Sequence, residues 1–144
     1  MDEGAALDRL LLVSTLLADD MATALQARGL TRARATVLWE VARHGPLTQR
    51  QIADLLGVTP RNVTTLIDAL EGTGFVTRTD HLSDRRAVLV RLTEQGELAA
   101  ARMERGATHL ARKLFGELSA PDLATFTGVL DHITARFSDT GVSG

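Results

Sequence analysis

Side chains that can bind a polyanion are concentrated in the middle of the chain. Residues 31–93 carry nine Arg and six acidic residues. The flanking regions have an acidic excess: residues 1–30 carry two Arg and five acidic residues, and residues 94–144 carry five basic and seven acidic residues. Because phosphate binding depends on Arg and Lys, the net charge of −2 for all 144 residues says little about this segment. Unless the charges are scattered at random, the partition indicates a basic middle region that can face nucleic acid.

The side chains best suited to contact DNA bases follow Pro60, in the first turns of a predicted helix. Arg61 can read guanine or bind phosphate, and Asn62 can read adenine. Thr64 and Thr65 can contact phosphate or a thymine methyl group. The N-terminus of a helix also offers backbone N–H groups to phosphate. The alternative for each residue is a solvated helix face.

These side chains need a helix-turn-helix to place them, and residues 49–68 have its pattern. Ala53 is the small residue where the two helices would cross, and Gly57 lies in the turn. The apolar residues that can hold the pair together are Ile52, Leu56, Val58, Val63 and Leu66. The alternative is a generic helical hairpin.

Capping residues predict where the first four helices begin and end. Apolar residues at helical spacing predict a helix that ends at Gly29, and Thr31 begins a second helix that runs towards His44. A short third helix ends at about Leu56 and begins with a capping box made by Thr48 and Gln51. The pair Thr59-Pro60 begins the fourth, which ends near Gly72 or Gly74.

A change of hydrophobic period predicts a small β-hairpin after the fourth helix. Apolar residues alternate over residues 75–79 and 87–92, on either side of a polar loop at residues 81–86. Two more helices begin at Thr93 and Ser119, and the last carries a heptad seam too short for a free-standing coiled coil. The final residues, 138–144, are expected to be disordered. The predicted fold is mainly α with a small β-hairpin wing, a winged helix-turn-helix flanked by a helical dimerisation region.

Composition argues against several classes of protein. The chain has no Cys, so it has no disulfide framework, thiolate metal site or Cys nucleophile, and an intracellular, cytoplasmic protein is expected. The acidic start and the lack of an apolar run of roughly 20 residues argue against a targeting or membrane segment. No two of the four His are four residues apart, and no Ser-His-Asp arrangement or glycine-rich phosphate loop occurs. We therefore expect no catalysis, no metal and no cofactor.

Five short motifs lie between Gly45 and Gly96. They are Gly45-Pro46-Leu47-Thr48, Ile52-Ala53-Asp54-Leu55-Leu56-Gly57-Val58-Thr59, Leu70-Glu71-Gly72-Thr73-Gly74-Phe75-Val76-Thr77-Arg78, Asp84-Arg85-Arg86 and Leu92-Thr93-Glu94-Gln95-Gly96. With the flanking helices, over roughly residues 5–138, they resemble the MarR family of bacterial transcriptional regulators.

The resemblance to this family implies an architecture and two kinds of partner. Residues 31–93 would form the DNA-binding lobe, residues 5–30 and 94–138 the dimerisation region of an obligate homodimer, and residues 139–144 a tail. The dimer would bind a pseudo-palindromic operator in double-stranded DNA. A small effector, often a phenolic or lipophilic anion, would be held between the dimer core and the lobe.

The resemblance also assigns roles in the hairpin loop, where Asp84 and Arg86 match the wing's Asp-x-Arg pattern. It implies that Arg86 enters the minor groove while Asp84 steadies it, and an Arg fork suits a narrow, A·T-rich minor groove. Arg85 and Arg78 are expected to contact phosphate or to brace the wing. The complete predicted DNA-binding set is Thr48, Thr59, Arg61, Asn62, Thr64, Thr65, Arg78, Asp84, Arg85 and Arg86.

A ligand pocket is implied by the resemblance alone, with the candidate lining residues Leu12, Thr15, Thr36, Trp39 and His44. A lone large aromatic residue such as Trp39 is otherwise expected in the core, and His44 can cap the end of its helix. Some family members sense zinc through His residues at places that match His44 and His109. The residue four after His109 is Lys113, which disfavours zinc sensing here.

The sequence thus predicts a dimeric winged helix-turn-helix transcription factor, a repressor that a small molecule releases from DNA. One alternative is a winged-helix module that binds protein and never touches DNA, which Arg61 and Arg86 count against. The other is a small helical enzyme, for which we find no acid–base constellation.

Overall fold

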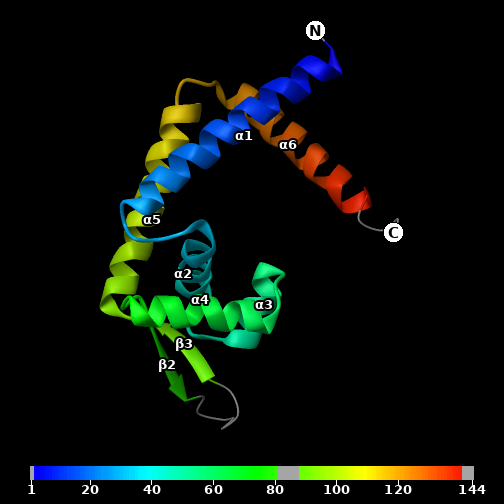
Figure 1. The fold of residues 1–144 in the computed structure, drawn as a ribbon. Helices are drawn as coiled ribbons and strands as arrows, with labels where there is room; N and C mark the ends of the chain where they lie inside the picture. Colours follow the sequence, from blue (N-terminus) through cyan, green and yellow to red (C-terminus); the bar gives the residue numbers. More distant parts are fainter. Residues whose placement is uncertain (1, 81–87, 141–144) are drawn as a thin grey trace. The chain divides into compact units, whose positions relative to one another are not determined.

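A computed structural model describes residues 2–80 and 88–140 of the chain (Figure 1). The chain divides into two compact units, Met1–Met103 and Glu104–Gly144. In chain order the elements are α1 (Glu3–Gln26), α2 (Arg32–His44), β1 (Leu47–Thr48), α3 (Gln49–Leu56), α4 (Pro60–Gly72), β2 (Val76–Asp80), β3 (Val88–Leu92), α5 (Glu94–Phe115) and α6 (Ala120–Thr140). The order confirms the predicted winged helix-turn-helix with flanking helices.

Threonine caps begin three helices of the first unit where the sequence predicts them. The side-chain oxygens of Thr31, Thr48 and Thr59 each accept a hydrogen bond from a backbone N–H in the first turn of α2, α3 and α4, respectively. The Thr48–Gln51 capping box is present in both directions. Such caps are each worth about 1 kcal/mol, so these boundaries are set by local chemistry.

The sheet has three antiparallel strands in the order β1-β3-β2. The predicted hairpin is confirmed, with Val76 opposite Leu92 and Asp80 opposite Val88. The sequence did not predict β1, which pairs Leu47 with Val90. A strand of two residues has no period to detect, so only its pairing in three dimensions identifies it.

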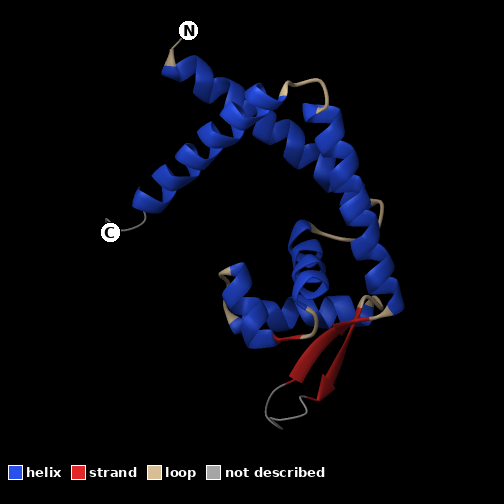
Figure 2. Ribbon diagram, turned by 180° about the vertical axis from the view of Figure 1, so that it is seen from behind, coloured by secondary structure: helices blue, strands red, loops and turns tan. Residues whose placement is uncertain are grey.

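The core of the first unit lies around α4, with α2 on one side and the β2–β3 hairpin on the other (Figures 1 and 2). Residues of α2, α3, α4 and β3 are completely buried in it: Val37, Leu38, Ile52, Val63, Ile67, Leu70 and Val90. Leu25 and Leu30, at and beyond the end of α1, belong to the same core.

The second unit contains the remainder of α5 and all of α6. The rings of Phe115 and Phe126 pack at a centroid distance of 5.7 Å, and the Ser119 hydroxyl accepts from the Asp122 N–H at the start of α6. Over residues 120–138, whose side chains are described, α6 has no buried residue. The prediction that disorder begins at residue 138 or 139 is wrong, because the i to i−4 ladder of α6 continues to Thr140. Residues 141–144 lie outside the described part.

Candidate nucleic-acid interface

Helices α3 and α4 form the predicted helix-turn-helix. Gly57 ends α3 with a left-handed backbone (φ +67°), which suits glycine because it has no Cβ. The N–H groups of Gly57 and Val58 both donate to the Ala53 carbonyl. Ala53 is only 2% exposed, as the small residue at a helix crossing should be. The turn therefore holds the start of α4 in a defined place beside α3.

The N-terminal turns of α4 present polar side chains to solvent. Arg61 and Asn62 are exposed, and Thr59 caps the helix by accepting from the Asn62 N–H at 3.2 Å. The positive end of the helix dipole and an exposed Arg fork therefore lie together at this end. This is the arrangement that a recognition helix needs in a major groove.

The hydroxyl groups of the four predicted threonines divide into two pairs. Thr64 donates to the Pro60 carbonyl at 3.1 Å and accepts from Gln49 Nε2 at 3.2 Å, and Thr65 donates to the Arg61 carbonyl at 3.4 Å. Their hydroxyl protons are engaged within the protein, so they can offer a base a methyl group and an acceptor oxygen but no hydroxyl donor. Thr48 and Thr59 accept backbone N–H bonds, which leaves their hydroxyl protons able to donate to phosphate.

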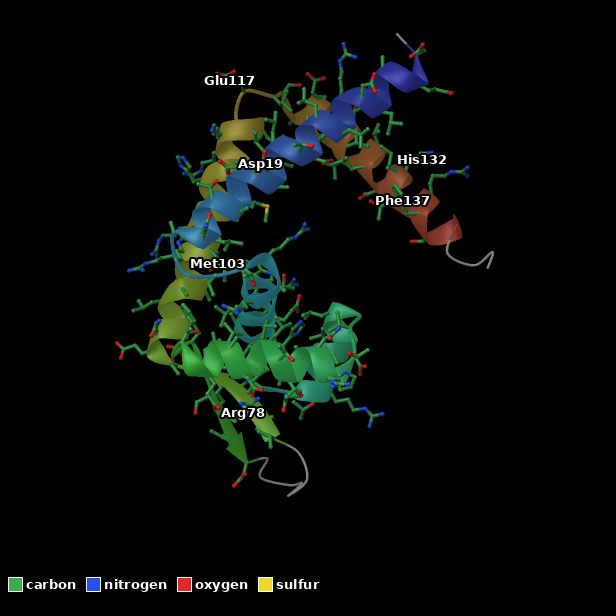
Figure 3. All side chains as sticks on the ribbon, in the orientation of Figure 1. Asp19, Arg78, Met103, Glu117, His132 and Phe137 are labelled. Carbon is green, nitrogen blue, oxygen red and sulfur yellow. The ribbon has the colours of Figure 1, made fainter. Side chains whose placement is uncertain are left out.

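Arg78 braces the wing against α4, one of the two roles predicted for it (Figure 3). Its Nη1 donates to Glu71 Oε1 at 2.8 Å, and its Nη2 donates to Asp68 Oδ1 at 2.5 Å. The Arg78 backbone N–H also donates to Glu71 Oε2 at 3.2 Å. Partial burial disfavours the charge of Arg78, but hydrogen bonds and attraction from Asp68 and Glu71 outweigh it and raise its pKa.

Sequence reasoning singled out Arg78 but missed its two partners. Asp68 and Glu71 stand three residues apart on α4, so they share one helix face, and their spacing was the available signal. Reasoning also missed Arg91 on β3, which is exposed and donates from Nε to Thr79 Oγ1 at 3.0 Å. The predicted wing residues Asp84, Arg85 and Arg86 lie outside the described residues.

Comparison with known proteins decides the family. The MarR family model matches residues 30–88. Over 97 residues the chain is 32% identical to YwhA of Bacillus subtilis (strain 168), an uncharacterised HTH-type transcriptional regulator, covering 67% of this chain and 70% of that protein. The chain belongs to the MarR family.

Two further likenesses agree with this assignment. The MarR-family chain is 27% identical over 119 residues to MdtR, an HTH-type transcriptional repressor of Bacillus subtilis (strain 168), covering 83% of this chain and 74% of that protein. Its fold is similar to that of Streptococcus pneumoniae FabT in complex with DNA, with a TM-score of 0.89, 20% identity, and coverage of 96% of this chain and 99% of that one. The protein is a DNA-binding transcriptional regulator with a winged helix-turn-helix, and its relatives are regulators, not enzymes.

The predicted ligand residues of this MarR-family protein lie on α1 and α2. Leu12 and Thr15 are exposed, and the Thr15 hydroxyl donates to the Leu11 carbonyl of its own helix. On α2, Thr36 likewise donates to the Arg32 carbonyl, and Trp39 is half-buried. His44 is the last residue of α2, with its Nε2 3.2 Å from Glu40 Oε2. Trp39 is thus the one large aromatic surface among the five.

Within the described residues no three His, Asp or Glu side chains cluster as metal ligands would. Among the same residues, no helix has the length and the apolar character needed to cross a bilayer.

Proposed function

We propose that this protein is a homodimeric repressor that binds a pseudo-palindromic operator and leaves it when a small ligand binds. The exposed apolar faces of α1 and α6 carry the proposal. Large contiguous apolar patches are rare on the surfaces of monomeric proteins and mark interaction sites.

The face of α1 is formed by leucines at helical spacing. Leu7 and Leu11 are 54% and 56% exposed, and Leu10 and Met21 extend the same stripe. Among the described residues of α1, Leu25 near the end of the helix is buried in the core of the first unit, whereas the leucines of the stripe are exposed. A second copy of the chain, related by a two-fold axis, would cover the stripe with the same residues of its own.

The face of α6 has the same character. Phe126 and Val129 are 41% and 49% exposed, and the seam of Leu123, Phe126, Leu130, Ile133 and Phe137 has the three- and four-residue spacing of helix-to-helix packing. Two such helices bury their apolar residues against each other, and the gain is about 25 cal/mol for each Å² removed from water.

Binding to DNA in this proposal uses α4 and the wing. Arg61 and Asn62 would read base edges in the major groove, and the hydroxyls of Thr48 and Thr59 would donate to phosphates. The methyl groups of Thr64 and Thr65 would contact thymine. From the family resemblance, Arg86 would enter the minor groove with Asp84 beside it and Arg85 on the backbone.

Release by a ligand is the part of the proposal that rests on the resemblance and on the placement of five residues. Leu12, Thr15, Thr36, Trp39 and His44 come from two helices of the first unit, and Trp39 supplies an aromatic wall suited to a phenolic or lipophilic molecule. A ligand that binds the free form better than the DNA-bound form lowers the affinity for DNA by that difference.

The test begins with the native protein and a random-sequence duplex DNA library. Repeated selection should recover two inverted half-sites about one helical turn, roughly 34 Å, apart. Light scattering at micromolar concentration should give a mass near that of two chains. A monomeric protein, or selection of one unpaired half-site, would overturn the dimer and the palindrome.

A further inference from the structure

The first turn of α5 is hydrogen-bonded to the segment where α4 ends and β2 begins. The Thr93 N–H donates to the Phe75 carbonyl at 3.1 Å, and the Thr93 hydroxyl donates to the Gly74 carbonyl at 2.6 Å. Gln95 Nε2 donates to the Thr73 carbonyl at 3.3 Å. Three successive carbonyls beyond the recognition helix thus accept from Thr93, the residue before α5, and from Gln95 in its first turn. We call the segments Thr73–Phe75 and Thr93–Gly96 the joint.

Thr93 does two things in the joint with one hydroxyl group. Its proton is donated to Gly74, while its oxygen accepts the Gly96 N–H at 3.1 Å and so caps α5. The bond from the Gly96 N–H fixes where α5 begins. The bond to the Gly74 carbonyl attaches this start of α5 to the segment that follows α4. Loss of this hydroxyl therefore loosens both the helix start and its attachment.

The joint is too tight for a side chain at Gly96. A Cβ atom built there would lie 2.1 Å from the Phe75 carbonyl oxygen and 3.3 Å from the Leu92 Cβ. The first of these atoms belongs to the backbone, so no rotamer change can relieve the clash. Gly74, on the other side, has φ +90°, and a Cβ there would lie 2.8 Å from Gln95 Oε1. Glycine at both places lets two backbone segments meet directly.

The turns of α5 that follow the joint pack into the core of the first unit. Ala99 and Ala100 are buried, and Met103 packs against the same core. The first ten residues of α5 therefore belong to the compact unit that contains α4. A change in the direction of α5 cannot be absorbed by a flexible link, because the link is hydrogen-bonded and the next turns are packed.

We propose that the joint fixes the direction of α5 relative to α4 and thereby determines the separation of half-sites that the protein accepts. Thr93 and Gly96 are positioning residues that act through α4. The inference rests on the proposed dimer, in which α5 leads from the recognition helix to the partner copy. The ten residues of α5 in the first unit span about 15 Å, so a tilt of roughly 11° moves Met103 by about 3 Å, close to the rise of one base pair.

The test compares two glycines on the same helix. Gly96→Ala introduces the backbone clash, whereas Gly106→Ala introduces a Cβ into open space. Each variant is titrated, as the full chain, with the operator selected by the native protein and with operators that have one base pair inserted or removed between the half-sites. At the native spacing we expect Gly96→Ala to bind about tenfold more weakly than the native protein does. At one of the two altered spacings its loss relative to the native protein on the same operator should be smaller. Gly106→Ala should stay within about twofold of the native protein at every spacing.

Simple loss of folded protein would weaken binding to all three operators by the same factor, so the ratio between spacings isolates positioning from stability. Should Gly96→Ala fail to fold, Thr93→Val removes the hydroxyl at nearly constant shape and Thr93→Ser restores it. We expect Thr93→Val to shift the spacing ratio about threefold and Thr93→Ser to return it to the native value.

The outcomes separate this inference from the proposed function. If the native protein selects paired half-sites and these variants keep its spacing ratio, the joint does not set the spacing and only this inference fails. If the native protein selects an unpaired site or is a monomer, the proposed function fails and the inference falls with it.

Discussion

Two parts of the chain use large apolar residues in opposite ways. In the first unit Ile67 and Leu70 of α4 are completely buried among α2, α3 and the sheet. In the second unit α6 carries Phe126, Leu130 and Phe137 at equally regular spacing, yet over residues 120–138 it buries none of its side chains. The core around α4 is closed within one chain, whereas α6 leaves an apolar face exposed, which a partner copy would cover in the proposed dimer. Mutations in the two regions should therefore alter different equilibria, one unimolecular and one concentration-dependent.

The largest effect is expected in the core of the first unit. Ile67→Ala removes three buried carbons and leaves a cavity, which costs about 2–5 kcal/mol of unfolding free energy. Denaturant unfolding followed by circular dichroism measures the loss. Leu130→Ala on α6 is the matched comparison, and its effect on the same transition should grow as the protein is diluted. A concentration-independent loss of equal size for Leu130→Ala would break the distinction between the two regions.

A charge on the α6 seam should act on association. Phe126→Asp places a carboxylate in the proposed interface, and we expect dimerisation to weaken by about 2–4 kcal/mol, the range of an interface hot spot. Sedimentation over a range of concentrations measures this change. Ala135→Asp, on the opposite side of the helical repeat from the seam, is the control and should leave the mass unchanged. If both variants dissociate equally, or neither does, the seam is not the interface.

On α4 the same distinction separates residues that bind DNA from those that support the fold. Arg61→Ala should weaken DNA binding by about 1–3 kcal/mol without changing the unfolding free energy, because its side chain is exposed. Arg86→Ala should do the same if the wing binds as the resemblance implies. Anisotropy titrations at several salt concentrations show which loss includes a phosphate contact, since the salt slope then falls by about 1. Unchanged affinity in Arg61→Ala would remove the α4 N-terminus from the interface.

The smallest effect is expected at the brace. Arg78→Gln should lower the unfolding free energy by about 1 kcal/mol, since its partners Asp68 and Glu71 are largely solvated and exposed ion pairs are weak. A double-mutant cycle with Glu71→Gln should give a coupling of about 0.5–1 kcal/mol. Arg91→Gln on the neighbouring strand is the control. An unchanged unfolding free energy together with a salt slope reduced by about 1 would instead make Arg78 a phosphate contact.

Local signals in the sequence predicted most of the fold. Thr31, Thr48 and Thr59 begin their helices because each side chain satisfies an N–H within three residues, which requires no distant partner. The β2–β3 hairpin was predicted from the alternation of apolar residues along each strand, which likewise is a local pattern. β1 was missed because two residues have no periodicity. The end of α6 was placed too early because the residues at 138–140 are polar and small, a composition that by itself favours disorder, whereas the helix continues to Thr140.

The candidate site was predicted in its residue types more than in its contacts. The sequence identified Arg61, Asn62 and the four threonines, but it did not distinguish which of the threonine hydroxyl protons stay available for DNA. The structure distinguishes Thr64 and Thr65, whose hydroxyl protons bond to their own helix, from Thr48 and Thr59, whose protons are available. It also shows that Arg78 is held by Asp68, ten positions earlier in the chain, and by Glu71, seven positions earlier.

By itself the sequence determined the helix starts, the turn at Gly57, the basic middle region and the family, because these depend on residue type and on neighbours a few positions away. Only the tertiary structure decided which polar groups remain free for DNA and how closely α5 approaches the end of α4. The need for glycine at position 96 is the clearest case. Its cause is the carbonyl oxygen of Phe75, which is 21 residues earlier in the sequence. This oxygen lies against Gly96 only because the β2–β3 hairpin folds the chain back.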